Sequence, residues 1–379
     1  MNKFSKKFNI NVVIFLCLFA IVFGKIVRYG VMTESLVKPG IGWKMVEKVN
    51  NDSYKFGLTV KDSESDSEVS NATANAGFVF AKINFLHLAN SYYEYEILIS
   101  VIWNIIVLLV ISNLKKSYYL WEMLFILVSV AVLNIFDFCL AKEPIQMIYF
   151  ILMYFILKSN KSSKFKFNGC LFIYFLSAFT YRNYYILMAG FFVFAFLTYK
   201  MIASKKNKVN FKQIFLILVL AYLCYFAILN VVKLVSPSHF NELIRVRLRT
   251  SSAASDMRAI FKTNNLVVFT LDYLIMIIRM MLPVELLKLG PKYAVYTLYQ
   301  ILISGIVFNN LRNVRNISTS RRIALFIYIA FLMGSAAFEP DFGSWIRHEA
   351  VLFPIFMIIS GFNENGGETS EKNTIQNNI

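Results

Sequence analysis

The sequence predicts an all-α, polytopic membrane protein with about ten transmembrane helices, and three observations lead to this fold class. Hydrophobic residues make up 58% of the 379 residues and the mean hydropathy is +0.57, more apolar than a soluble domain. The apolar residues form runs near the length that crosses a bilayer, and clusters of Lys and Arg separate these runs. We therefore interpret the net charge of +17 as a signal of membrane orientation, and we expect no nucleic-acid partner.

The predicted spans follow from the apolar runs, several of which are short and must tilt or pack deeply. They lie at residues 8–27, 97–114, 119–141, 144–157, 167–181, 184–199, 211–235, 293–311, 323–338 and 350–362. If the basic clusters between them are cytoplasmic, both termini lie inside. Segment 266–282 contains Asp272 and Arg279, and counting it as a span would put a later basic cluster outside. We predict a re-entrant or interfacial helix there, on the outer side.

Four regions follow from this topology. They are an N-terminal anchor span (1–28), an outer loop (29–95), a transmembrane helical domain (96–362) with a basic outer loop (236–265), and a disordered cytoplasmic tail (363–379). Within the first loop, segment 61–77 is rich in Ser and acids and is predicted to be flexible. Lys25 and Arg28, at the outer end of the first span, break the positive-inside pattern, and we interpret them as snorkelling side chains.

Several functional classes are excluded by missing motifs. The chain has no GxxxxGKS or GxxxxGKT sequence, no HExxH, no nucleophile elbow and no paired metal ligands. An ATP-driven pump, a metalloprotease and a serine hydrolase are therefore set aside, and we expect neither a metal nor a cofactor. The cysteines stand singly in apolar runs and are predicted to be inert packing thiols: Cys17, Cys139, Cys170 and Cys224.

Ionisable residues near the ends of the predicted spans converge on the outer face. Such groups are costly at membrane depth and tend to line functional cavities, although each one alone can be an interfacial ion pair. The residues concerned are Asp137, Lys142, Glu143, Arg182, the arginines of the basic loop, and the stretch 339–349.

The basic loop places Arg245, Arg247 and Arg249 at every second position. Guanidinium groups bind phosphate through two parallel hydrogen bonds, so a loop of this kind beside a membrane favours a lipid phosphate or diphosphate. The alternative is simple attraction to anionic lipid headgroups.

The stretch EPDFGSWIRHEAVLFPI (339–355) crowds acids, an Arg and a His around a glycine, with apolar runs on both sides. We predict that Gly343 permits a tight turn that brings Asp341 beside Arg347, above a cavity of the last two spans. Arg347 would contact phosphate or sugar, Asp341 would orient it or act as a base, and His348 is a second candidate for proton handling. The alternative is that these charges pair with one another and anchor a loop.

Taken together, these features resemble the bacterial surface-polysaccharide polymerases called Wzy, within the wider membrane-embedded glycosyltransferases of the GT-C type. The resemblance rests on an N-terminal span with a long outer loop, the Arg-rich loop, and the segments FDFCLAKEPIQMIYFIL, YRNYYILM and FGSWIRHEAVLFPI. It implies transfer of a growing glycan from undecaprenyl diphosphate onto the next lipid-linked repeat unit, at the outer face of the bacterial cytoplasmic membrane. The implied partners are the undecaprenyl-diphosphate-linked oligosaccharide, the lipid bilayer and other polysaccharide assembly proteins.

The resemblance also implies roles for individual residues. The substrate-binding candidates are Arg182, Arg245, Arg247, Arg249, Arg347 and His348. For the catalytic carboxylate, Glu143 and Asp341 fit by position, and Asp52 would be favoured by a GT-C enzyme that adds one sugar from a polyprenyl phosphate donor. A flippase for lipid-linked oligosaccharide and a non-catalytic scaffold stay open, but charges confined to one face favour catalysis over transport.

Overall fold

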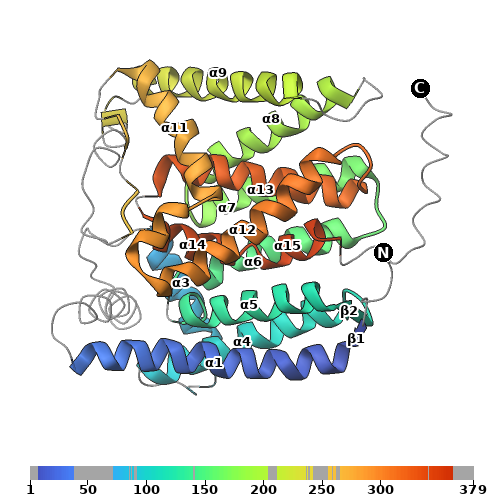
Figure 1. Ribbon diagram of the computed structural model, residues 1–379, viewed down its shortest axis with the longest axis vertical. Helices are drawn as coiled ribbons and strands as arrows, with labels where there is room; N and C mark the ends of the chain where they lie inside the picture. Colours follow the sequence, from blue (N-terminus) through green and yellow to red (C-terminus); the bar gives the residue numbers. More distant parts are fainter. Residues whose placement is uncertain are drawn as a thin grey trace. The chain divides into compact units, whose positions relative to one another are not determined.

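The computed structural model is mainly helical (Figure 1), and it describes residues 7–37, 71–84, 92–139, 141–203, 211–235, 255–257, 259–261, 265–339 and 341–361, with a few isolated positions besides. Each apolar run that was predicted as a span overlaps a helix, and so does segment 266–282. The helical class is therefore confirmed. By its internal contacts the chain divides into two compact units, which are described separately.

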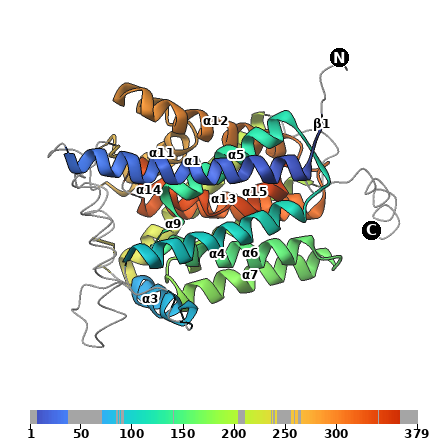
Figure 2. The same ribbon diagram turned by 90° about the horizontal axis from the view of Figure 1, so that it is seen from below.

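The first unit comprises Met1–Phe155, Thr180–Arg182 and Ala350–Ile379. Its elements are β1 (Lys7–Asn9), α1 (Ile10–Val37), α3 (Asn71–Ile83), α4 (Tyr92–Ser112), β2 (Ser117–Tyr119), α5 (Leu120–Phe136), most of α6 (Glu143–Lys158) and α15 (Phe353–Ile359). Helix α1 runs alongside α5 (Figure 2), and β1 pairs antiparallel with β2, which ties together the starts of these two helices. The two helices approach closely at Gly24, where an added Cβ would lie 2.8 Å from Ala131 O.

Helix α4 has the inside-out pattern of a membrane helix. One face carries exposed apolar residues at four-residue intervals, Ile97, Val101, Ile105 and Leu109. The buried polar residues Glu96, Ser100 and Asn104 also recur every four residues. A soluble helix would bury the first set and expose the second, whereas lipid reverses the preference because it solvates apolar side chains and not polar ones.

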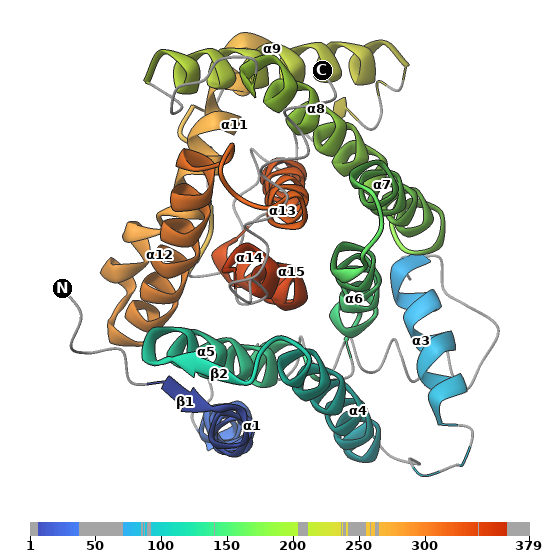
Figure 3. The same ribbon diagram turned by 90° about the vertical axis from the view of Figure 1, so that its right-hand side faces the viewer.

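The second unit comprises Ile156–Phe179 and Asn183–Glu349. Its elements are most of α7 (Ser163–Thr180), α8 (Tyr185–Ala203), α9 (Phe211–Val235), α11 (Leu266–Met281), the 3₁₀ helix η1 (Val284–Leu289), α12 (Pro291–Arg312), α13 (Thr319–Phe338) and α14 (Phe342–Ala350). Helix α13 is central in this unit: in Figure 3, which looks along it, α8 lies on one side and α11 and α12 on the other. At Gly334 an added Cβ would lie 2.6 Å from Met188 Cγ, so a side chain there would collide with α8.

By length and composition, four helices in the described part of the chain can cross a membrane: Ile10–Arg28, Glu94–Ser112, Tyr293–Arg312 and Thr319–Phe338. A fifth is present if α14 and α15, which are bent by 70° at a short break, count as one broken span or re-entrant loop. The chain thus has the helices of a membrane protein. Ten crossings, cytoplasmic termini and a re-entrant α11 stay predictions.

Two local expectations differ from the structure. Helix α1 continues to Val37, into the predicted outer loop, although its stretch that can cross a membrane ends at Arg28, as was predicted for the anchor span. Helix α3 covers Asn71–Ile83 and so includes part of the segment that was predicted to be flexible. Its residues Ala76 and Phe80 are buried, and the Ser-rich sequence before them does not predict this burial.

Candidate functional site

Several ionisable residues of the second unit lie at the end of α13 and along α14. Asp341 directly precedes α14, and its Oδ1 accepts a hydrogen bond from Ser344 N at 2.8 Å, as an N-cap residue does. The backbone at this point is fixed as well, since Phe342 N donates to Ser255 O at 3.0 Å. The cap gives Asp341 a structural role, and its catalytic role stays a prediction.

Gly343 does not make the tight turn predicted for it. It lies in the first turn of α14, and the glycines with positive φ among the described residues are Gly290 and Gly361. A Cβ at position 343 would lie 3.1 Å from Asp341 Oδ1. Glycine at this position therefore leaves room for the capping carboxylate of Asp341. The prediction of a turn was wrong because glycine is also the common residue of tight turns.

Glu339 and His348 form a buried pair across the helix start. His348 Nδ1 lies 2.5 Å from Glu339 Oε1, and both side chains are buried. A carboxylate accepts hydrogen bonds, so Nδ1 carries the proton in this contact. In a neutral imidazole with this tautomer, the lone pair lies on Nε2, as it does in a general base held by a carboxylate.

Arg347 neighbours this pair on α14 and is partly exposed. The guanidinium of Arg347 can bind an anion, and the imidazole of His348 can transfer a proton. Both chemistries are therefore available within one turn of α14. Direct contact between Arg347 and Asp341 stays a prediction.

Glu143 and Arg182 belong to the first unit, where the structure brings their two loops together. Tyr181 OH donates to Lys142 O at 3.2 Å, which links the residue before Glu143 to the residue before Arg182. The guanidinium of Arg182 lies over the Tyr181 ring, 5.6 Å from its centroid. Glu143 is buried at the start of α6, where Trp103 Nε1 donates to Pro144 O at 2.8 Å.

The remaining predicted site residues, Asp52, Arg245, Arg247 and Arg249, lie outside the described residues. Among the residues that the structure describes, no group of three or more His, Cys, Asp or Glu side chains is arranged to hold a metal ion.

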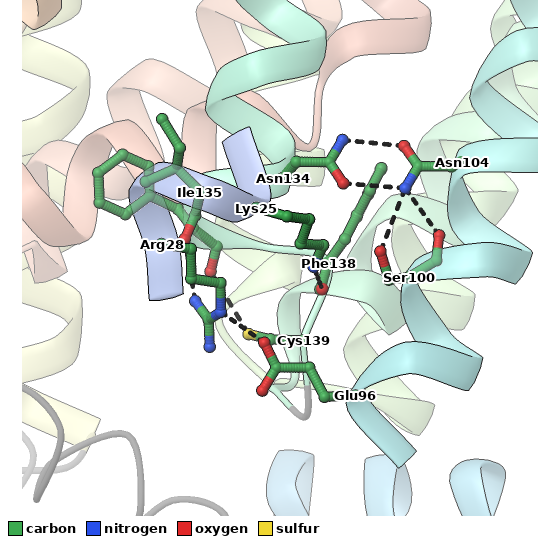
Figure 4. Close-up of polar contacts among 10 residues, drawn as sticks. Lys25, Arg28, Glu96, Ser100, Asn104, Asn134, Ile135, Phe138 and Cys139 are labelled. Atoms are coloured by element: carbon green, nitrogen blue, oxygen red, sulfur yellow. Dashed lines mark hydrogen bonds and ion pairs between the residues drawn. The ribbon is translucent and has the colours of Figure 1, made fainter. Parts of the chain in front are cut away.

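A second charged cluster was missed by the sequence interpretation. Arg28 is 3% exposed; its Nε donates to Glu96 Oε1 at 2.5 Å and its Nη1 to Ile135 O at 2.9 Å (Figure 4). Lys25 Nζ donates to Phe138 O at 2.6 Å. The snorkelling interpretation is therefore wrong, because both cations point into the first unit, where a carboxylate and two carbonyl groups receive them.

Beside these charges, α4 and α5 are joined by a reciprocal amide pair. Asn104 Nδ2 donates to Asn134 Oδ1 and Asn134 Nδ2 donates to Asn104 Oδ1, each at 2.9 Å (Figure 4). With Ser100 and Glu96 they form a buried polar stripe. The four-residue spacing of Glu96, Ser100 and Asn104 is the sequence signal that would have located it.

The comparisons with known proteins add no family to this geometry: the chain has no significant match to any protein-family model, curated protein or solved structure.

Proposed function

We propose that this chain is a membrane-embedded glycosyltransferase of the bacterial cytoplasmic membrane that polymerises undecaprenyl-diphosphate-linked oligosaccharide repeat units at its outer face. The observation that carries the proposal is the arrangement of Glu339, Arg347 and His348 at the broken segment α14–α15. A base and an anion-binding group there would lie at a bent helix pair that is apolar enough for one broken span or a re-entrant loop, and ionisable groups at such places tend to be functional.

The reaction sets two chemical demands. A sugar hydroxyl attacks the anomeric carbon of the donor glycan, the bond from that carbon to the diphosphate oxygen breaks, and the hydroxyl proton passes to a base. The leaving diphosphate keeps the bonding electron pair and gains negative charge, so a positioned cation lowers the barrier. A base within hydrogen-bond reach of the hydroxyl contributes roughly 10²–10⁴-fold.

In this proposal His348 is the base, Glu339 is a positioning residue for its imidazole, and Arg347 binds the diphosphate. Asp341 holds the start of α14 so that these side chains keep their places. The arginines of the basic loop, Arg245, Arg247 and Arg249, stay proposed as further diphosphate ligands, and Arg182 and Glu143 as a substrate contact and a second candidate base.

The test is extension of lipid-linked repeat units by the purified full-length chain in lipid. Arg347→Ala and His348→Asn are expected to lose extension by about 10²-fold or more. Arg279→Ala is the matched control, because it removes a guanidinium of the same unit whose ion pair with Glu285 is partly exposed. The proposal fails if Arg347→Ala and His348→Asn, with wild-type thermal stability, both extend the glycan normally.

A strain that lacks the protein separates polymerisation from the addition of a single sugar. Loss of a polymerase leaves complete single repeat units on the lipid, whereas loss of an earlier GT-C transferase leaves truncated units. Complete units confined to the inner leaflet would instead indicate a flippase.

A further inference from the structure

Three of the buried glutamates that the structure describes differ in what balances their charge. Glu96 is paired with Arg28 at 2.5 Å, and Glu122 is paired with Lys115 at 2.6 Å. Glu349 is 0% exposed, yet within the described part of the chain it forms no ion pair. A different chemistry must therefore stabilise it.

The partners of Glu349 are neutral. Its Oε1 accepts hydrogen bonds from Gln300 Nε2 on α12 at 2.9 Å and from Tyr328 OH on α13 at 2.8 Å. Its Oε2 is buried and has no hydrogen-bond partner among the described residues, and the same is true of Gln300 Oε1. Two acceptor atoms on hydrogen-bonded side chains thus lack a donor.

The titratable groups near Glu349 do not supply a cation. Tyr328 contacts it from α13, and Tyr299 lies beside that tyrosine on α12. On α14 itself the preceding residue is His348, whose Nδ1 is held by Glu339. An ionised carboxylate here would be an uncompensated charge in an apolar interior, at a cost of several kcal/mol by general estimates.

We propose that Glu349, Gln300 and Tyr328 form a proton-binding site, in which Glu349 holds a proton on Oε2. A carboxylic acid and a primary amide bond face to face through two hydrogen bonds, and one of these, from Gln300 Nε2 to Glu349 Oε1, is already present. With a proton on Oε2, Glu349 can donate the second hydrogen bond to Gln300 Oε1, so both oxygens gain a partner. The proton also removes the unpaired charge of the carboxylate. The site is independent of the proposed glycosyl transfer.

The test is infrared spectroscopy of the full-length chain reconstituted in lipid at neutral pH, which requires no reagent to reach the buried site. A neutral carboxylic acid has a carbonyl stretching band well separated from that of a carboxylate. We expect this band in the wild-type protein and its loss in Glu349→Gln. The variant is expected to fold, because its new amide oxygen still accepts from Gln300 and Tyr328.

Glu122→Gln is the matched control, since it removes a buried glutamate that an ammonium group already balances. This variant is expected to keep the band. An equal band in wild-type and Glu349→Gln proteins of the same helix content, or its absence from the wild-type protein, would overturn the proton site.

Discussion

Arg28 and Glu96 meet inside the first unit although 68 residues separate them in the chain: the guanidinium Nε lies 2.5 Å from the carboxylate, and the two side chains are 3% and 1% exposed. Removing one member of such a pair leaves the other charged and buried. Arg28→Ala is therefore expected to lower the free energy of unfolding by about 3–5 kcal/mol. Unfolding in mixed detergent micelles measures it.

The apolar double variant Arg28→Met/Glu96→Leu is the control for this first prediction. Because it removes both charges, it should unfold at or near the wild-type free energy. A loss of stability equal to that of Arg28→Ala would show that the pair contributes more than the removal of an unpaired charge explains.

Two helical glycines should respond in opposite directions to a single added methyl group. Gly24→Ala places a Cβ 2.8 Å from the backbone oxygen of Ala131, which cannot move without shifting α5, so we expect a loss of about 1–3 kcal/mol. Gly190→Ala, on an exposed face of α8 with nothing within 4 Å, should gain about 0.5–1 kcal/mol from lower chain entropy. Equal effects in the same unfolding assay would contradict the close approach of α1 and α5.

The predicted orientation of α7 is tested with one cysteine at each of its ends. Asn160, in the loop before the helix, and Asn183, after it, are both exposed. In intact cells a membrane-impermeant maleimide is expected to label Asn183→Cys and not Asn160→Cys, because the lysines around position 160 favour the cytoplasm. The parent chain, whose Cys17, Cys139 and Cys170 are buried, measures background labelling. Labelling of Asn160→Cys alone would show that α7 crosses the membrane in the direction opposite to the predicted one.

Glu339→Gln separates the positioning role of this residue from a purely structural one. The amide keeps a hydrogen bond to His348 but no longer requires the proton on Nδ1, so the tautomer with its lone pair on Nε2 loses its preference. Glycan extension should fall by about 10²-fold or more in kcat, with little change in KM. Unchanged kcat, or an effect on KM alone, would assign Glu339 to packing or binding.

The sequence predicted the helices well because length and hydropathy are local properties. It failed where a residue type has two uses: Gly343 marks a turn in many loops, but here it makes room for the Asp341 cap, and an Asp three residues before Ser344 was the available signal. It also failed for Arg28, whose partner is distant in the chain. A single sequence shows that an arginine is present at the end of a span, but it does not show which later helix carries the carboxylate that pairs with it.

The pairing of β1 with β2 and of α1 with α5 bears on the order in which this protein is assembled. Helix α1 leaves the ribosome well before α5, because the residues that closely approach Gly24, Ala131 and Asn134, are made more than a hundred residues later. Until Glu96 and then α5 arrive, Arg28 has no internal partner and must stay with the lipid headgroups or water. Helix α1 thus docks only after α5 has been made, and in a nascent chain halted before α5 the face of α1 around Gly24 lacks the helix that covers it in the folded protein.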